Sequence, residues 1–163
     1  MTLAQFTEPK LLVPRMLSTH RESAIIELSR RLEVVGRIEN ADSYVDAVLD
    51  HEAIASAVID GVTFPLARGR AVKGLTFAAG LSRHGIRWGL GRSPVVHTVV
   101  LFALPLAETQ TYLSLVLTFT RFIKDELAFP AFTRATQPEG MLSVLKAVRL
   151  VPMIAQPQPA GVE

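Results

Sequence analysis

The sequence predicts a mixed α/β fold, a three-layer α-β-α sandwich with a mixed central sheet in a single domain. Its predicted elements follow in the order strand, helix, helix, several strands and then helices, which favours a mixed sheet with helices on both faces. Residues 95–104 are nearly all β-branched or apolar, as expected of a central strand covered on both sides. The 163 residues suffice for one domain with its own core, and they contain no internal repeat.

The first part of the chain predicts one strand and two helices. Residues 11–13 form a short apolar run closed by a proline, which indicates a buried strand. Thr19 and Glu22 have the spacing of a capping box, so we expect a helix that begins there and ends near Gly36. A second helix should begin near residues 42–43 and carry valines inward.

The rest of the chain predicts the other strands and the second set of helices. Residues 62–65 indicate a strand end that runs into a loop, and residues 72–81 indicate a further strand. A strongly apolar helix should span about residues 108–125, followed by a short helical piece around Phe132 and a last helix over residues 141–148.

The sequence also predicts a domain boundary and a cellular location. We expect the domain to occupy residues 1–150 and a polar, proline-rich tail to occupy residues 151–163 without packing against it. Residues 1–6 lack the basic start and apolar run of a signal peptide, and the longest apolar stretch, residues 94–106, is too short to span a bilayer. The prediction is therefore a cytoplasmic protein without membrane insertion.

Composition excludes several classes of function. A net charge of +2 is too small for a nucleic-acid footprint, so no nucleic-acid partner is expected. The chain has no cysteine, which excludes disulfides, thiolate catalysis and cysteine-ligated metal sites. The four histidines show no metal-ligand spacing, so we predict neither a metal nor any other cofactor.

Two segments in the middle of the chain carry a resemblance to a known family. The first has a His-Glu pair at residues 51–52, an Asp-Gly pair at residues 60–61 and the sequence VTFPLAR at residues 62–68. The second contains SPV at residues 93–95 and VVLFALP at residues 99–105, and it continues into ETQTYL at the start of a predicted helix.

In their order and spacing, these segments resemble the fructose/mannitol-type (type-2) EIIA domain of the bacterial phosphotransferase system, including its nitrogen-regulatory EIIA-like branch. The resemblance covers roughly residues 3–150. It implies an α/β domain that takes a phosphoryl group from the carrier HPr onto a histidine. Family members pass that group to a IIB domain in sugar transport or use it as a regulatory signal.

This sequence departs from the family at all three functional positions. Leu66 stands where the family has its phosphate-accepting histidine, and leucine has no lone pair with which to accept a phosphoryl group. Tyr112 stands in place of the supporting histidine, and His51 in place of the arginine that offsets phosphate charge. The resemblance therefore implies a degenerate site, with Leu66, Tyr112 and His51 as vestigial positions and no phosphotransferase activity.

Residues around the vacated position are candidates for binding. These are Thr63, Pro65, Arg68 and Arg70. Two basic clusters follow in the sequence, the first with Arg68, Arg70 and Lys73 and the second with Arg83, Arg87 and Arg92. Each arginine alone is best read as a solvated loop charge, but together they could form a positive rim around the vacated site that attracts an acidic partner or an anion.

Three functions remain open on the sequence. The first is a regulatory or protein-binding module whose partner is an HPr-like carrier, a kinase or a transporter component. The second is an active phosphocarrier that uses a relocated residue such as His51. The third is a small-anion-binding module that reuses the vacated pocket. The sequence leaves the oligomeric state undetermined.

Overall fold

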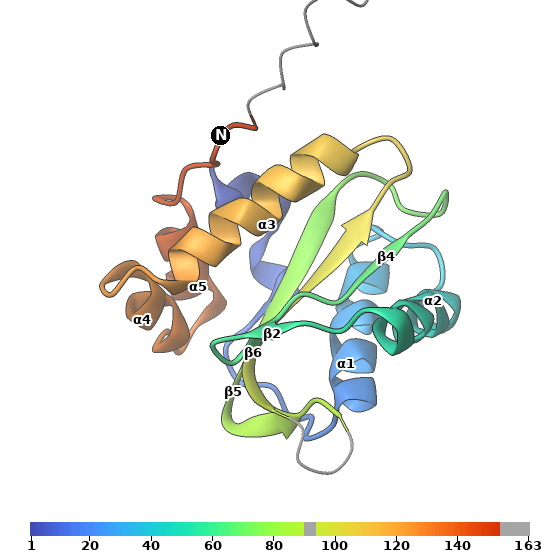
Figure 1. Ribbon diagram of the computed structural model, residues 1–163, viewed down its shortest axis with the longest axis horizontal. Coiled ribbons are helices and arrows are strands. Elements are labelled where there is room, and N and C mark those ends of the chain that lie inside the picture. Colours follow the sequence, from blue (N-terminus) through green and yellow to red (C-terminus); the bar gives the residue numbers. More distant parts are fainter. Residues whose placement is uncertain (90–93, 154–163) are drawn as a thin grey trace, which may run out of the picture.

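A mixed β-sheet separates two layers of helices in the computed structural model, which describes residues 1–89 and 94–153 (Figure 1). In chain order the described elements are the 3-10 helices η1 (Leu3–Phe6) and η2 (Pro9–Leu11), β1 (Leu12–Val13), α1 (Arg21–Val34), α2 (Ala41–Ile54), β2 (Val58–Ile59), β3 (Val62–Thr63), β4 (Leu66–Arg68), β5 (Thr76–Arg87), β6 (Val95–Leu104), α3 (Thr109–Ile123), α4 (Ala128–Thr133) and α5 (Pro138–Leu145). This arrangement confirms the predicted three-layer α/β fold.

Strand β6 is the central strand of the sheet. The strand order is β1-β5-β6-β3-β2, and β4 also pairs with β6. Strand β5 runs antiparallel to β6, whereas β3 and β4 run parallel to it. The prediction that residues 95–104 form a central strand is confirmed.

Side chains of β6 alternate between two hydrophobic cores, which explains why residues 99–104 of the strand are all apolar. Val99, Leu101 and Ala103 face α1 and α2. Val100, Phe102 and Leu104 face α3, α4 and α5. Burial on both faces leaves no position in the second half of this strand for a polar side chain.

Strands β3 and β4 are two parts of one run along β6, interrupted at Phe64 and Pro65. Proline has no backbone N–H and cannot donate to a sheet, but its carbonyl remains an acceptor. The backbone N–H of Phe102 donates to the carbonyl of Pro65 at 2.9 Å, so the chain stays alongside β6 across the break. Beyond the break, Leu66 lies opposite Phe102 in the parallel register.

Strand β5 begins and ends later than the predicted strand over residues 72–81. The segment before it forms a loop, because the N–H of Gly69 donates to Leu104 and that of Lys73 donates to Arg37, each at 3.1 Å. After residue 81 the strand continues through an irregularity in its register with β6. Gly85 has a φ of +89° there, and a Cβ at this position would lie 2.3 Å from Val95 Cγ1, so only glycine fits.

Helix α1 begins at Arg21, and the predicted capping box of Thr19 is wrong. His20 is the N-cap residue, and it makes no side-chain cap hydrogen bond. Thr19 instead lies beside β5, where its carbonyl accepts the N–H of Arg87 at 2.9 Å. Helix α2 begins close to its predicted start, and its N-cap is Asn40, whose Oδ1 accepts the N–H of Ser43 at 3.0 Å.

Helix α3 buries two polar residues that the apolar pattern did not indicate. Ser114 and Thr118 are buried because they bond the chain after α5: the Ser114 hydroxyl donates to the Val151 carbonyl, and the Val151 N–H donates to Thr118 Oγ1 at 2.9 Å. Leu113 is 44% exposed instead. Of the predicted tail, residues 154–163 lie outside the described residues. No helix of the described ranges is both long and apolar enough to cross a membrane.

A buried hydrogen bond fixes the end of α2 against the chain that leaves β5. The indole N–H of Trp88 donates to Glu52 Oε2 at 3.1 Å, and both side chains are buried. A buried carboxylate that loses its donor has no access to water as a replacement, so this pair holds α2 in place beside the sheet.

We therefore expect Trp88→Phe to lower the free energy of unfolding by about 1–3 kcal/mol, the cost of a buried polar group left without its partner. The measurement is urea denaturation followed by circular dichroism, since the substitution removes the single tryptophan of the chain. Glu52→Gln keeps a carbonyl acceptor for the indole and should cost less. Equal midpoints for Trp88→Phe and the parent protein would contradict this role of the pair.

Candidate functional site

Leu66 and Tyr112 both lie beside one aromatic ring, that of Phe102. Leu66 lies on β4 directly beside Phe102 and packs, half-buried, on the side of the sheet that α3 covers. Tyr112 lies in the first turn of α3, and its ring contacts that of Phe102 edge-on, with centroids 5.3 Å apart and planes at 85°. The structure therefore brings two of the three predicted vestigial positions into one packing neighbourhood.

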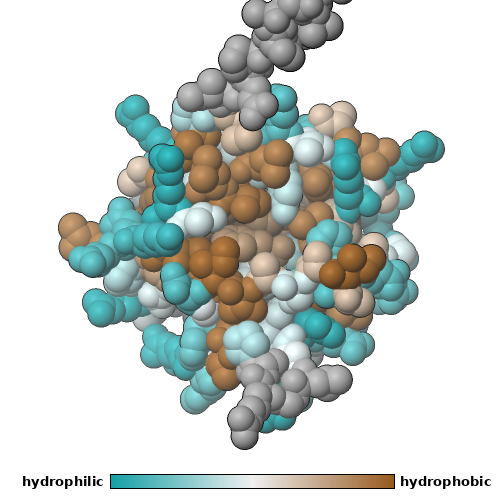
Figure 2. Space-filling view, in the orientation of Figure 1, coloured by the Kyte–Doolittle hydropathy of each residue, from teal (hydrophilic) through white to brown (hydrophobic). Residues whose placement is uncertain are grey.

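Leu66 and Tyr112 belong to a larger apolar surface. We define it as Phe64, Leu66, Tyr112, Leu113 and Val116. Phe64 extends it from the strand break, where its ring lies 6.3 Å from Phe102 and 5.9 Å from Phe119. Figure 2 shows hydrophobic side chains gathered over the middle of this face, where α3 crosses in front of the sheet. Leucine, valine and aromatic side chains offer this surface little besides contact area.

Arg68 connects the end of β4 to the start of α3. Its Nη2 donates to Thr109 Oγ1 at 2.8 Å and to the carbonyl of Leu106. The guanidinium lies at the rim of the apolar surface and is already bonded to the protein on one edge. It holds the loop between β6 and α3 near β4, and its other N–H groups face solvent.

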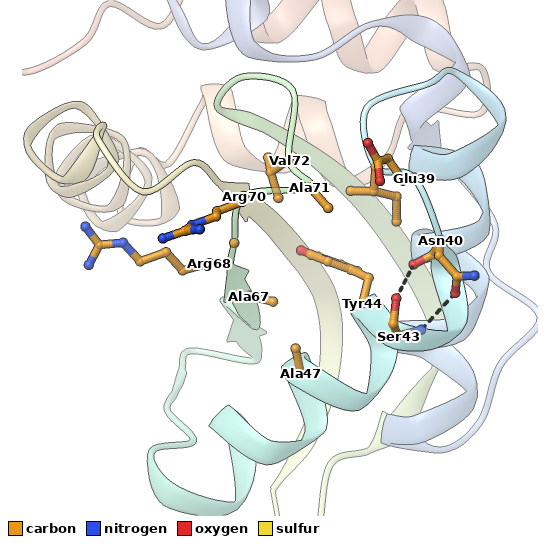
Figure 3. A pocket seen from close by; sticks show the side chains of 12 residues that line it. Glu39, Asn40, Ser43, Tyr44, Ala47, Ala67, Arg68, Arg70, Ala71 and Val72 are labelled. Atoms are coloured by element: carbon orange, nitrogen blue, oxygen red, sulfur yellow. Dashed lines mark hydrogen bonds between the residues drawn. The ribbon is translucent and has the colours of Figure 1, made fainter.

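A pocket of about 160 Å³ lies on the other side of β4, between the start of α2 and residues 67–72. Figure 3 shows Tyr44 directed across it, with Asn40 and Ser43 at its α2 wall and the side chains of Arg68 and Arg70 pointing away from Tyr44. The phenol of Tyr44 donates to the carbonyl of Phe102, and the cap of α2 satisfies its own polar groups.

Thr63 and Pro65, two of the predicted binding residues, are buried. Thr63 lies opposite Val99, on the side of α1 and α2, and its hydroxyl donates to the carbonyl of Ala57 at 3.0 Å. Its oxygen is therefore occupied within the protein. The structure leaves Arg68 and Arg70 as the exposed members of the predicted binding set.

His51 lies in the opposite layer from Tyr112. It occupies the last turn of α2, is exposed, and directly precedes the buried Glu52. At 1.5 Å per residue, His51 lies about 10 Å further along α2 than Tyr44. The sheet therefore stands between its helix and α3.

The second basic cluster does not line the same site. Arg87 pairs with Val95 at the start of β6, seven residues before Phe102. At about 3.3 Å per residue, this separates the two by roughly 23 Å. The expected rim of both clusters around the vacated position is thus wrong for Arg83 and Arg87, which lie at the other end of the sheet, and Arg92 lies outside the described residues.

The titratable side chain beside Leu66 is the phenol of Tyr112. Burial raises the pKa of the Tyr112 phenol above its ordinary value of 10.0, so the hydroxyl stays protonated at neutral pH. Within the described residues, no group of three or more His, Asp or Glu side chains is arranged to hold a metal ion.

Comparison with known proteins identifies the family. The chain belongs to the family described as phosphoenolpyruvate-dependent sugar phosphotransferase system, EIIA 2, which matches residues 6–148. It is 29% identical over 148 residues to the PTS system 2-O-alpha-mannosyl-D-glycerate-specific EIIABC component of Escherichia coli (strain K12). That match covers 89% of this chain and 22% of the relative, so the chain spans about a fifth of the relative's length.

Solved structures share the fold. The nitrogen regulatory protein IIA-Ntr of Neisseria meningitidis superimposes with a TM-score of 0.77 at 15% identity, over 88% of this chain and 98% of that one. The IIA mannitol structure of Escherichia coli gives 0.70 at 19% identity, over 85% and 97%. IIA mannitol has also been solved in complex with phosphorylated IIB mannitol, and that structure gives 0.71 at 19% identity, over 85% of this chain and 96% of that one.

Sequence reasoning missed several residues whose side chains join the elements around the site and elsewhere in the fold. Tyr44, Trp88 and Thr109 all bond across elements that are distant in sequence, and a single sequence carries no direct sign of such pairs. The sequence could indicate that Tyr44 is buried, because it lies on the buried stripe of α2 next to Val45 and Val48, but it could not indicate its hydrogen-bond partner. Its partner, a backbone carbonyl, has no side-chain signature.

The two tyrosines of this chain should titrate abnormally. Burial raises the pKa of Tyr44 as well as that of Tyr112, although a backbone hydrogen bond partly opposes it for Tyr44. Below pH 10 the folded and unfolded chains both hold these protons. Above it the unfolded chain releases them first, so the free energy of unfolding should fall as pH rises. Tyrosinate absorbance of the folded protein should appear at higher pH than that of the unfolded chain. A reversible titration of either tyrosine near pH 10 in the folded protein would contradict this burial.

Proposed function

We propose that this chain is a type-2 EIIA domain that does not accept a phosphoryl group and acts as a regulatory module through protein contacts. The observation that carries the proposal is Leu66, half-buried beside Phe102 on the side of the sheet that α3 covers, in the position that the family resemblance assigns to the acceptor histidine. Replacement of an imidazole by an alkyl side chain removes the lone pair that the transfer requires.

The groups around Leu66 support the loss of transfer chemistry. Tyr112 remains protonated at neutral pH because burial raises its pKa, and within the described residues its hydroxyl forms no hydrogen bond with a base that could activate it. The Thr63 hydroxyl is buried and donates to a carbonyl. His51 belongs to a helix on the opposite layer of the sheet, and misplacement by even about an ångström is costly in a transfer reaction.

The apolar surface supports a role in protein contact. Phe64, Tyr112 and Val116 are half-buried beside Leu66, and Leu113 is 44% exposed among them. Exposed apolar groups that cluster on one face are typical of a surface that another protein covers. The related IIA mannitol domain forms a complex with phosphorylated IIB mannitol, which is a precedent for protein docking in this fold.

On this proposal the partner is another protein of the phosphotransferase system or one that the system regulates, such as an HPr-like carrier, a kinase or a transporter component. A domain that is never phosphorylated presents one constant surface. It can therefore hold a partner in one state or compete for it with a phosphorylatable EIIA domain.

Incubation with Enzyme I, HPr and phosphoenolpyruvate should leave this protein without an acid-labile phosphoryl group, because no residue at the site is a competent acceptor. Transfer of radiolabelled phosphate, resolved under alkaline conditions, measures this. Leu66→His alone should accept phosphate poorly. Leu66→His combined with Tyr112→His and His51→Arg should accept more, since the supporting groups return. Stoichiometric labelling of the unmodified protein that His51→Ala abolishes would make this chain a phosphocarrier with a moved active site.

Competition tests the docking role independently of phosphorylation. An excess of this protein should slow the transfer from phosphorylated HPr to an active type-2 EIIA domain, because both use the same face of the carrier. Leu113→Asp places a charge in the apolar surface and should weaken the inhibition roughly ten-fold. Leu127→Asp is the matched control, since Leu127 is 86% exposed and lies outside that surface. If both variants inhibited the transfer as strongly as the parent protein does, the apolar surface would be excluded as the surface that contacts HPr.

A further inference from the structure

Four arginines lie on one edge of the sheet, at the end opposite the apolar surface. Arg15 and Arg83 line one shallow hollow, and Arg21 and Arg87 line the next. We call these four residues, with Leu17 between them, the basic edge. It lies where β5 ends, at the lower end of the sheet in Figure 1. None of the four guanidiniums forms an ion pair or hydrogen bond with another residue of the described ranges.

Backbone pairing makes the basic edge a continuous structure. The chain that follows β1 stays beside β5, since the N–H of Met16 donates to the carbonyl of Leu81 at 2.8 Å. Further along, the N–H of Arg87 donates to the carbonyl of Thr19 at 2.9 Å, and His20 bridges Arg87. Residues 15–21 and 81–87 therefore present their charged side chains from two adjacent, hydrogen-bonded segments.

Leu17 is the apolar residue in the middle of this surface, and it is held outward. Its side chain is 85% exposed. The carboxylate of Glu27 accepts the N–H groups of Leu17 and Ser18 at 3.3 and 3.2 Å and the Ser18 hydroxyl at 2.6 Å. These three bonds fix the backbone, so exposure of Leu17 is a fixed feature of the fold and does not arise from a loose loop.

The charge of the basic edge is positive even with its nearby carboxylates included. Glu22 shares the second hollow, and Glu27 is bonded to the Leu17 backbone. Four arginines against these two carboxylates give a formal charge of +2, which equals the net charge of the entire chain. The basic edge is therefore net positive and can attract an anionic surface.

We propose that the basic edge binds the surface of an anionic lipid bilayer, with the guanidiniums on lipid phosphates and Leu17 inserted between the headgroups. Basic side chains attract anionic lipid, and an apolar side chain among them adds burial in the interface. A guanidinium group can also donate two parallel hydrogen bonds to two oxygens of one phosphate. An exposed leucine among the arginines favours a bilayer over a nucleic acid, because an apolar side chain can be buried in the lipid interface.

This placement leaves the apolar surface accessible. Arg87 and Phe102 lie seven residues apart along the β5–β6 register, or roughly 23 Å. A protein adsorbed through the basic edge would therefore direct Leu66 and Tyr112 away from the bilayer. The inference is independent of whether the chain accepts phosphate.

Sedimentation with vesicles tests the proposal on the full chain. Vesicles of phosphatidylserine and phosphatidylcholine in equal amounts should bind the protein at roughly 0.1 M salt and release it near 1 M, where charges are screened beyond about 3 Å. Vesicles of phosphatidylcholine alone should not bind it. Arg83→Gln with Arg87→Gln should weaken binding about thirty-fold. Leu17→Ser should weaken it roughly ten-fold.

The matched control removes the same charge elsewhere. Arg30→Gln with Arg121→Gln alters two exposed arginines on α1 and α3 and should bind vesicles like the parent protein. If both double variants lost the same vesicle affinity, the binding would depend on net charge alone and the proposal would be overturned. Failure of the parent protein to bind anionic vesicles would also overturn it. Binding of a DNA duplex, but not of vesicles, that depends on Arg83 and Arg87 would assign the basic edge to nucleic acid instead.

Discussion

Phe102 joins both helical layers to the sheet, and the site depends on it. Its N–H donates to Pro65 at 2.9 Å, which carries the chain across the break between β3 and β4. Its carbonyl accepts the phenol of Tyr44 from α2 on one side of the sheet. Its ring meets Tyr112 of α3 on the other side at 5.3 Å. One residue therefore sets the position of β4, the depth of α2 and the approach of α3, and Leu66 is placed by all three.

Much of the fold could be predicted because the clearest hydrophobic patterns extend over whole strands and helices. Residues 99–104 are all apolar, as burial on both faces of the sheet requires, and the helices carry apolar stripes. Local signals failed where a tertiary contact competed with them. Thr19 has the spacing of a cap, but its backbone pairs with Arg87 of β5. Residues 72–75 have the composition of a strand, but their hydrogen bonds to other segments make them a loop.

The site was predictable in part, for the same reason. The family resemblance led to Leu66 and Tyr112, which the register of β4 with β6 brings to one ring. The direction of Thr63 was not predictable, because the break at Pro65 interrupts the alternation that would relate it to Leu66. The separation of the two basic clusters was equally hidden, since Arg70 and Arg83 are close in sequence while β5 carries the chain to the far end of the sheet.

The outer strands of the sheet are short, and this affects how a protein with an apolar central strand avoids aggregation. Strands β1 and β2 are two residues long, and the Asp-Gly turn at residues 60–61, with φ of +50° and +76°, reverses the chain immediately after β2. A longer outer strand would expose a row of unpaired N–H and C=O groups to a second molecule. Here each outer strand ends before such a row forms, so β6 keeps its continuous apolar sequence inside a sheet whose borders resist edge-to-edge aggregation.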